Sequence, residues 1–318
     1  DSIRAISGGL RIPLAELYTT ISFYHHLSTE PGGRDRPRVC TGPVCCLRDG
    51  DAILAELGEG ATAMPCPGRC DEPVAVLRGG EVLRGLRAGE LESAPSPLPA
   101  ANPGGLDECV FGSIRKPGRA TLAGYRESGG YEALRKAALE MSPEKLVDEI
   151  SESGLAGRGG AGFPTGQKWR AVAEAAGNPK TIVCNADEGE PGTFKDRWFL
   201  ERDPHRFLEG MLIAAWAVEA EGIYIYLRDE YPEIRQILLA ELPKVEAAGL
   251  VESGRVHLRR GAGAYICGEE SAMLESIEGK RGLPRHKPPF PAQVGLFGRP
   301  TLIHNVETLY WVRDLVEK

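Results

Sequence analysis

The chain has 318 residues, with 38 Lys or Arg against 45 Asp or Glu, so its formal net charge is -7. This balance excludes a chain-wide basic surface for nucleic acid, and the ordinary 42% hydrophobic and 26% charged content excludes a disordered or fibrous protein. The length suggests about two domains, the 40 glycines exceed the usual share, and no apolar run approaches a membrane span.

The start of the chain and its cysteines bear on location. The first residues lack the basic and apolar regions of a secretory signal, so we expect a cytoplasmic protein that does not insert into a membrane. The chain begins at Asp1 rather than at methionine, which suggests a trimmed sequence. Cytoplasmic thiols stay reduced, so the eight cysteines indicate metal, cluster or catalysis before disulfides.

The first 91 residues mix helical and strand patterns, which predicts a small α/β sandwich. Apolar residues at helical spacing indicate the helices, and Gly79-Gly80 marks the turn of a hairpin. The expected elements are, in order, a helix over 14–27, a strand over 37–40, a helix over 51–57, a strand over 61–64 and a hairpin over 72–83.

A segment rich in proline and glycine, 92–107, separates this domain from a larger one. We place the linker at 92–125 and the second domain at 126–318. Helical and strand patterns alternate there, which predicts α/β structure with a largely parallel sheet. The expected elements are helices over 131–139, 143–151, 168–176, 204–220 and 231–242, and strands over 181–184, 222–227 and 256–258.

Four cysteines form two widely spaced pairs, Cys40 with Cys45 and Cys66 with Cys70. Thiolates are soft ligands for zinc or iron–sulfur centres, and neither pair has the C-x2-C spacing of structural zinc. The spacing suits the larger Fe2S2 unit better, although a plant-type ferredoxin would need cysteine where Arg48 stands. Zinc, disulfides and unpaired core thiols remain alternatives. The other four cysteines are interpreted as packing thiols: Cys46, Cys109, Cys184 and Cys267.

A glycine-rich loop at 157–162 satisfies G-x-G-x-x-G but follows an expected helix instead of a strand. An ordinary dinucleotide fingerprint is therefore not expected. Backbone N–H groups, a helix N-terminus and the cations Arg158 and Lys168 together predict a phosphate site. The alternative is a flexible turn with solvated charges.

An acidic turn, NADEGEPGT at 185–193, follows the expected strand over 181–184. Its three carboxylates lie at the carboxyl end of that strand, where ligands bind in open α/β sheets. They could bind a divalent metal, ribose hydroxyls or the edge of a flavin ring. The segment 261–271, GAGAYICGEES, has the same character, with a helix start carrying acidic residues as its alternative.

These motifs carry a family resemblance. The runs GLAGRGGAGFPTGQKW, NADEGEPGTFKDR, GAYICGEESAMLESIEG and PTLIHNVETL resemble the flavin subunit of NADH dehydrogenases, which includes the 51-kDa subunit of respiratory complex I. VCTGPVC and CPGRC resemble its 24-kDa partner, a thioredoxin-like [2Fe-2S] protein. Fusion of both modules is typical of diaphorase subunits of NAD-linked formate dehydrogenases and hydrogenases. The ending VETLYWVRDLVEK most resembles the beta subunit of molybdenum-containing, NAD-dependent formate dehydrogenase.

The resemblance implies a thioredoxin-like [2Fe-2S] domain followed by a Rossmann-like α/β domain for FMN and NAD(H). It implies hydride transfer between NAD and FMN, with electrons relayed through iron–sulfur clusters to a molybdenum catalytic subunit and a small [2Fe-2S] subunit. The cofactors carry this chemistry, so no catalytic side chain is expected. The alternatives are the same module in a hydrogenase or complex I, and a non-enzymatic zinc- and nucleotide-binding scaffold.

The resemblance also assigns residues to these cofactors. The implied cluster ligands are Cys40, Cys45, Cys66 and Cys70. The implied FMN residues are Gly157, Arg158, Gly159, Lys168, Asn185, Asp187, Glu188, Gly268, Glu269, Glu270 and Asn305. The implied NADH residues are Phe163, Glu190, Tyr265 and Phe290.

Two departures from the family pattern stand out. His304 replaces the first of two asparagines that usually precede VET, and it is kept as a cofactor residue because histidine can still donate a hydrogen bond. The ubiquitin-like domain and the helical domain with C-x2-C-x2-C that follow in the family are not found in these residues. A [4Fe-4S] cluster is therefore expected only in a missing C-terminal part.

Overall fold

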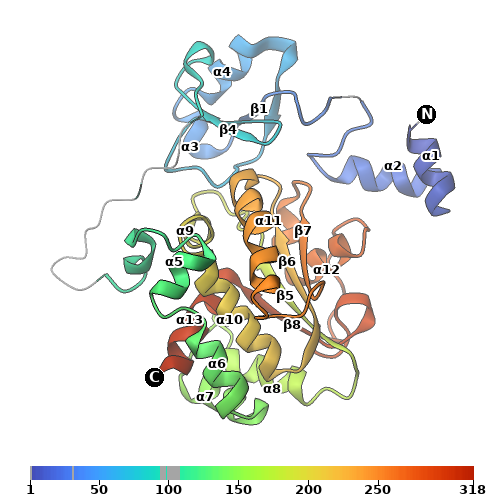
Figure 1. Ribbon diagram of the computed structural model, residues 1–318. Coiled ribbons are helices and arrows are strands. Elements are labelled where there is room, and N and C mark those ends of the chain that lie inside the picture. Colours follow the sequence, from blue (N-terminus) through green and yellow to red (C-terminus); the bar gives the residue numbers. More distant parts are fainter. Residues whose placement is uncertain (1, 31, 94–97, 99–107) are drawn as a thin grey trace.

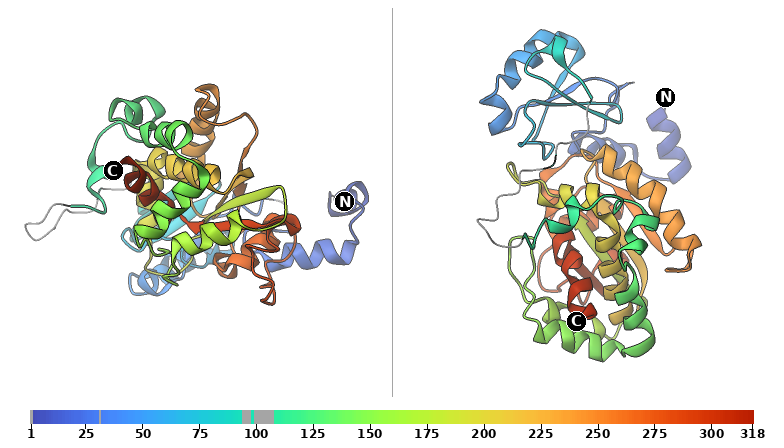
Figure 2. Two further views of the ribbon diagram at one scale, coloured as in Figure 1. Left: turned by 90° about the horizontal axis from the view of Figure 1, so that it is seen from below. Right: turned by 60° about the vertical axis from the view of Figure 1, so that its left-hand side comes forward.

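The computed structural model describes residues 2–30, 32–93, 98 and 108–318. It places a small α/β domain above a larger one, with an N-terminal helical arm to one side (Figure 1). The arm consists of α1, Ser2–Leu10, and α2, Leu14–Phe23, neither of which has a buried residue. Both helices extend away from the rest of the molecule (Figure 2). The helix predicted over 14–27 ends early because Tyr24 is extended and packs in an apolar cluster of the larger domain.

The small domain contains a four-stranded sheet in the order β2-β1-β3-β4. β1 pairs parallel with β2 and antiparallel with β3, and β3 and β4 form the predicted hairpin. All the strands and the helix expected after the arm are confirmed, and one short helix is added. The elements are β1 Arg38–Cys40, α3 Pro43–Cys46, α4 Gly50–Leu57, β2 Thr62–Met64, β3 Ala75–Arg78 and β4 Glu81–Arg84.

The larger domain contains a parallel sheet in the order β7-β6-β5-β8. Parallel pairing brings the carboxyl ends of all four strands to one edge, where ligands bind in such sheets. Three of these strands were predicted. β8 was missed because it has only two adjacent apolar residues, which are flanked by polar ones. The strands are β5 Lys180–Ala186, β6 Ala220–Leu227, β7 Val256–Arg260 and β8 Thr301–Asn305.

Helices surround this sheet, and α10 forms the centre of the core. It packs against β5, β6, α6 and α13 and is buried at nearly every position. A Cβ at Gly210 of α10 would lie 1.9 Å from the carbonyl oxygen of Leu309 in α13, so the close crossing of the two helices requires glycine there. The helices are α5 Leu122–Glu127, α6 Glu132–Glu140, α7 Pro143–Glu152, α8 Thr165–Ala173, α9 Lys195–Arg202, α10 Pro204–Ala217, α11 Pro232–Ala247, α12 Glu270–Ile277 and α13 Val306–Glu317.

Short 3-10 helices complete the described elements. They are η1 Gly58–Gly60, η2 Ala88–Glu90, η3 Gly112–Arg115, η4 Tyr265–Gly268 and η5 Leu296–Gly298. Within the described part of the chain, no helix combines the length and apolarity needed to cross a membrane.

The segment predicted as a linker, 92–125, includes residues 94–97 and 99–107, which lie outside the described residues. Its later part, 108–125, packs on the larger domain. Ile114, Leu122 and Tyr125 are buried in the core of that domain, and Arg119 pairs with Asp203 at 3.0 Å. The core of the larger domain therefore begins within the range that the sequence assigned to a linker.

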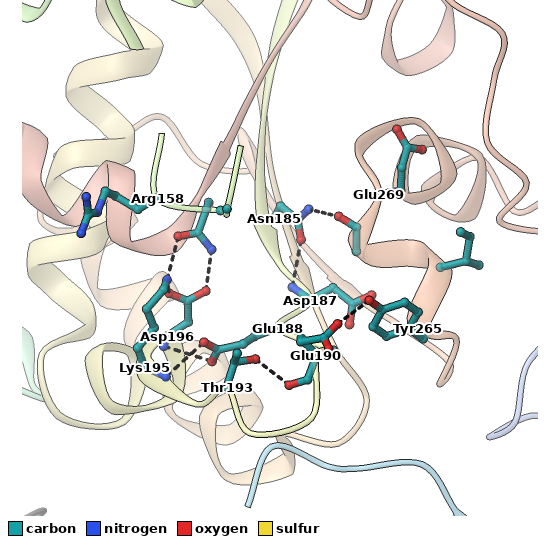
Figure 3. A pocket seen from close by; sticks show the side chains of 16 residues that line it. Arg158, Asn185, Asp187, Glu188, Glu190, Thr193, Lys195, Asp196, Tyr265 and Glu269 are labelled. Atoms are coloured by element: carbon teal, nitrogen blue, oxygen red, sulfur yellow. Dashed lines mark hydrogen bonds and ion pairs between the residues drawn. The ribbon is translucent and has the colours of Figure 1, made fainter. Parts of the chain in front are cut away.

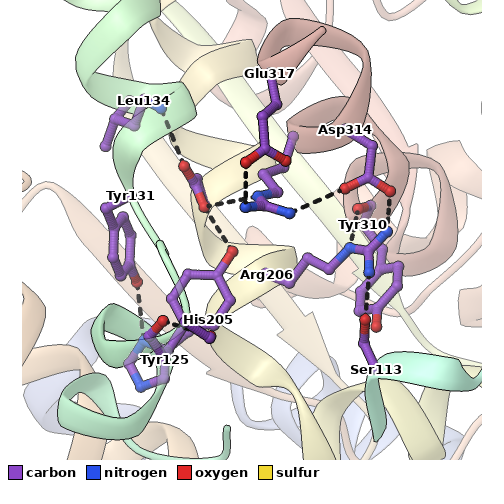
Figure 4. A network of polar contacts seen from close by, with 12 residues as sticks. Ser113, Tyr125, Tyr131, Leu134, His205, Arg206, Tyr310, Asp314 and Glu317 are labelled. Atoms are coloured by element: carbon purple, nitrogen blue, oxygen red, sulfur yellow. Dashed lines mark hydrogen bonds and ion pairs between the residues drawn. The ribbon is translucent and has the colours of Figure 1, made fainter. Parts of the chain in front are cut away.

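A buried polar network joins the helices of the larger domain (Figure 4). Tyr125 in α5 donates to Glu209 in α10 at 2.5 Å. His205 of α10 contacts the Tyr131 hydroxyl at 2.9 Å through Nδ1 and the Glu241 carboxylate at 3.1 Å through Nε2. Such satisfied networks hold buried polar groups in one geometry. This network anchors α10, against which α13 packs, and α13 begins directly after β8 at the carboxyl edge of the sheet.

Candidate functional site

Two adjoining cavities of about 550 and 730 Å³ lie along the carboxyl edge of the parallel sheet. Both volumes fall within the range of small-molecule and cofactor sites. Every residue that the sequence assigned to FMN or NADH lines one cavity or both. The two cavities form one cleft because they share the lining residues Gly159, Asn185, Gly268, Glu269 and Asn305.

The glycine-rich loop forms one wall of this cleft. The backbone N–H of Gly157 donates to the carbonyl of Phe163 at 2.8 Å and closes the loop. Gly160 and Gly162 have φ angles of +109° and +63°, and no atom lies within 4 Å of a Cβ placed at either position. The backbone therefore faces open space in a conformation that other residues rarely adopt, which permits close approach of a ligand.

Arg158 and Lys168, the two cations of the predicted phosphate site, line different cavities of the cleft. Arg158 lines the smaller cavity and pairs through Nε with Glu307 at 3.0 Å. Lys168 lines the larger cavity, with Nζ 3.5 Å from Glu270 Oε2. The two cations therefore reach the cleft in its two different cavities, and a single phosphate site that both of them serve stays a prediction.

The acidic turn forms the opposite wall (Figure 3). Asn185, the first residue of the turn, donates from Nδ2 to the carbonyl of Gly268 at 2.9 Å and accepts from the backbone N–H of Asp187 at 3.1 Å. Glu190 accepts from the Tyr265 hydroxyl at 2.5 Å. These bonds join the turn after β5 to the 3-10 helix η4, so two segments far apart in sequence form one wall.

The segment that contains Glu269 begins a helix and also lines the cleft. The carboxylate of Glu269 caps α12 by accepting from the backbone N–H groups of Ser271 and Ala272, both at 2.9 Å. Lys287 Nζ pairs with Glu269 at 2.9 Å and with Glu270 at 2.7 Å. This segment is therefore both the start of a helix and part of the wall of the cleft.

Glu188 and Asp196 lie close together beside the cleft. The carboxylate of Glu188 accepts from the backbone N–H groups of Lys195 and Asp196, both at 3.0 Å. Burial, followed by repulsion from Asp196, raises the pKa of Glu188 to about 7. Burial also raises the pKa of Asp187 to about 7, although the charge of Arg228 opposes this. Full ionisation of the acidic turn is therefore unfavourable unless a ligand supplies cations or hydrogen-bond donors.

We expect Asp187→Asn to stabilise the ligand-free chain above neutral pH by about 2 kcal/mol. Because the pKa of Asp187 is raised on folding, its contribution to stability is present below about pH 4 and is lost as the pH rises to about 7. Urea unfolding at about pH 5 and about pH 8 measures the difference. The exposed Asp148→Asn is the matched control, and an equal pH response in Asp187→Asn and wild type would contradict the prediction.

Lys195 is a cleft residue that sequence reasoning missed. Its ammonium lies 2.6 Å from Asp196 Oδ1, 3.1 Å from Glu307 Oε2 and 3.1 Å from Asn305 Oδ1. It stands just after the acidic turn, in the FKDR run, and its charge is a signal that could have been read as compensation for the carboxylates. Thr193, Asp196 and Lys287 also line the cleft without having been predicted.

His304, the departure from the family pattern, is buried and lines the larger cavity. The indole N–H of Trp169 donates to its Nε2 at 2.9 Å. Burial and the charge of Lys168 lower the pKa of His304 to about 3. The imidazole is therefore neutral at physiological pH and, because Nε2 accepts, carries its proton on Nδ1.

The four predicted cluster ligands converge in the small domain. Cys40, Cys45 and Cys66 are buried and Cys70 is half-buried, and all four are free thiols. The sulfurs of Cys66 and Cys70 lie 3.3 Å apart, and the Cys40 thiol hydrogen-bonds to both Cys45 and Cys66. Within the described residues, no group of three or more His, Cys, Asp or Glu side chains is arranged to hold a metal ion.

The chemistry of these thiols fits an iron–sulfur cluster. Hydrogen bonding with Cys40 lowers the pKa of Cys66 to about 5 and that of Cys45 to about 7, and the same contacts raise the pKa of Cys40. Thiolates are the form that binds metal. Burial and Cys66 raise the pKa of Cys70 to about 12, partly opposed by a hydrogen bond from the backbone of Gly192. Because Gly192 belongs to the acidic turn, the cysteine loop, residues 66–70, lies against that turn of the larger domain.

The other cysteines divide into two groups. Cys184 and Cys267 are buried, which confirms their interpretation as packing thiols. Cys46 and Cys109 are exposed, so that interpretation is wrong for them. The Cys46 thiol donates to the carbonyl of Thr41 at 3.2 Å on the outside of α3, while its neighbour Cys45 faces inward.

Two family models match the chain. Residues 150–314, more than half of the chain, match the Nuo51 FMN-binding domain. Residues 1–65 match the thioredoxin-like [2Fe-2S] ferredoxin, a range that includes Cys40 and Cys45 and ends before Cys66. The two matches confirm the predicted fold classes and the predicted FMN and [2Fe-2S] cofactors.

Named relatives agree with these models. The chain is 37% identical to the alpha subunit of NAD-reducing hydrogenase HoxS of Cupriavidus necator, across 98% of this chain and 58% of the relative. It is 54% identical to a subunit of the NADH-quinone oxidoreductase of Rhizobium meliloti, across 66% of this chain and 52% of the relative. The crystal structure of an air-oxidized NAD+-reducing [NiFe]-hydrogenase superposes with a TM-score of 0.81 at 30% identity, over 100% of this chain and 58% of that one. The chain thus spans a little over half the length of these relatives.

Proposed function

Because this chain belongs to the Nuo51 FMN-binding domain family, we propose that it is the diaphorase module of a larger oxidoreductase. In this proposal the cleft binds FMN and NAD(H) together, and hydride passes between them. Electrons pass to or from a [2Fe-2S] cluster on Cys40, Cys45, Cys66 and Cys70. The observation that carries the proposal is the cleft itself, in which two cavities share lining residues. Two ligands bound in these cavities would lie next to each other.

Bound FMN supplies the exchange between two-electron chemistry at nicotinamide and one-electron chemistry at the cluster. The residues of the chain bind and orient the two ligands. Phe163, Tyr265 and Phe290 are 47%, 61% and 55% exposed at the cleft, which leaves aromatic faces free to stack on planar rings. Orienting two reactants in this way removes much of the entropic barrier to their reaction, and the proposal needs no side chain as acid or base.

The sequence placed the cluster domain at 1–91 and the flavin domain at 126–318, and we keep the first of these ranges and the end of the second. The described residues of 108–125 pack with the flavin domain, which supports moving its start toward residue 108.

We propose a formate dehydrogenase as the complex, with a molybdenum catalytic subunit and a small [2Fe-2S] subunit as partners. Support comes from the resemblance of the final residues to the beta subunit of that enzyme. A second candidate is an NAD-reducing hydrogenase, favoured by the match to HoxS alpha across both modules. Purification of the native complex, followed by NAD+ reduction with formate or with hydrogen, separates the two.

The module itself is tested by its visible absorption spectrum and by NADH oxidation with ferricyanide as acceptor. A diaphorase shows flavin and iron–sulfur bands and reduces ferricyanide. A zinc- and nucleotide-binding scaffold shows neither, and that result would refute the proposed function.

We expect Glu190→Lys to weaken NADH binding by about tenfold while FMN stays bound, which corresponds to one hydrogen-bonded contact. The reason is that the Glu190 carboxylate, already fixed by the Tyr265 hydroxyl, is placed to accept from ribose hydroxyls. Fluorescence titration with NADH measures the affinity, and the flavin absorbance of the same sample measures retention of FMN. An unchanged NADH affinity would remove Glu190 from the proposed site.

A further inference from the structure

Arg228 lies between the cysteine loop of the small domain and the acidic turn of the larger domain. It is buried and follows directly after β6. Its Nη2 donates to the backbone carbonyl of Cys66 at 2.7 Å, and its Nη1 donates to the backbone carbonyl of Glu188. One guanidinium therefore bridges a proposed iron ligand and a residue of the proposed flavin cleft.

The surroundings of this guanidinium fix its position. Glu230 pairs with Nη2 at 3.2 Å, and the ring of Tyr231 lies 5.1 Å from the guanidinium carbon. Gly68, with a φ of +71°, closes another side: a Cβ there would lie 3.1 Å from Arg228 Nη1 and 2.5 Å from the Tyr231 hydroxyl. The cysteine loop thus approaches Arg228 more closely than a side chain at position 68 would allow.

Two other arginines hold the same loop independently of Arg228. Arg197 is fully buried and donates from Nη1 to the carbonyl of Gly68 at 3.0 Å. In the opposite direction, Arg69 of the loop reaches into the larger domain, with Nη2 3.3 Å from Glu201 Oε1. We therefore expect the loop to stay docked through these contacts when Arg228 is changed, so that the electrostatic effect of Arg228 can be measured separately from the docking.

We propose that Arg228, a positioning residue between the cysteine loop and the acidic turn, raises the reduction potential of the [2Fe-2S] cluster. The proposal rests on the cysteine ligand set proposed above. One-electron reduction converts two ferric ions into one ferric and one ferrous ion and adds one negative charge, with no proton transferred. A cation that donates to the carbonyl of a ligand residue stabilises that added charge, since charge and hydrogen bonding set cluster potentials. Glu230 offsets part of this stabilisation.

The test measures the midpoint potential of the cluster in the full chain, by dithionite titration followed by electron paramagnetic resonance. Arg228→Gln removes the charge and keeps an amide donor. We expect it to make reduction tenfold less favourable, a shift of about 59 mV to lower potential for one electron. Arg228→Lys keeps the charge, but its ammonium cannot span both carbonyls, so we expect a smaller shift in the same direction. Arg259→Gln removes the same charge from an exposed position in β7 and is expected to leave the potential unchanged.

The outcomes are distinguishable. A wild-type chain without a [2Fe-2S] signal would overturn the ligand set and this inference with it. A signal of equal potential in wild type and Arg228→Gln would overturn the inference alone. Loss of the signal in both Arg228 variants would assign the residue to folding or cluster insertion instead, and an equal shift in Arg259→Gln would reveal a general charge effect. Either result would also overturn the inference.

Discussion

Replacing Cys66 with serine is expected to abolish the [2Fe-2S] signal in electron paramagnetic resonance while FMN remains bound. The Cys66 thiol is buried and lies in contact with the thiols of Cys40 and Cys70. Serine offers a hard hydroxyl in place of a soft thiolate, and the loss of one of four ligands leaves an iron without its full coordination. The residues that line the cleft belong to the larger domain, so flavin absorbance is expected to persist.

Cys46→Ser is the matched control for this experiment. Cys46 follows a proposed ligand directly in the sequence, but its thiol is exposed and donates to the carbonyl of Thr41. We expect the cluster signal and the iron content of this variant to equal those of wild type. A cluster that survives in Cys66→Ser, or disappears in Cys46→Ser, would require a different ligand set.

The sequence predicted the fold well wherever local pattern and tertiary position agree. The hairpin over 72–83 follows from Gly79-Gly80 between two apolar runs, and β5 and β6 follow from continuous buried runs. It missed β8, in which Thr301 and His304 flank the apolar pair. Those polar residues are buried by contacts with other segments, Thr301 with Thr181 at 2.7 Å and His304 with Trp169, which no local pattern contains.

In the candidate site, too, features that depend on local motifs could be predicted from the sequence, and features that depend on tertiary contacts could not. Residues in the recognisable motifs line one cleft, because loops at the carboxyl edge of a parallel sheet converge. The separation of Arg158 from Lys168 depends on the path of the glycine loop. The role of Arg228 depends on how the two domains dock. In the sequence, Arg228 stands in LRDE and resembles a solvated charge at the end of a strand. Its burial could be found only from the assembled structure.

Reversing the charge of Lys168 is expected to lower the affinity for FMN by about a hundredfold, equivalent to about 2.7 kcal/mol. Lys168 extends from α8 into the larger cavity, and the ammonium there already faces the carboxylate of Glu270 at 3.5 Å. Lys168→Glu removes the charge-assisted contact that we propose between Lys168 and the phosphate of FMN, and it places a second carboxylate beside Glu270. Both changes weaken the binding of FMN, because its phosphate group carries two negative charges.

Flavin retained after desalting and the affinity for FMN added back to stripped protein measure this effect. Lys145→Glu makes the same change in charge on the exposed side of α7 and is expected to bind FMN as wild type does. Because Lys168 lies in the larger domain, the [2Fe-2S] signal of Lys168→Glu should remain while flavin is lost. Equal FMN affinity in Lys168→Glu and Lys145→Glu would place the phosphate elsewhere, and Arg158 in the smaller cavity would then become the cation to test.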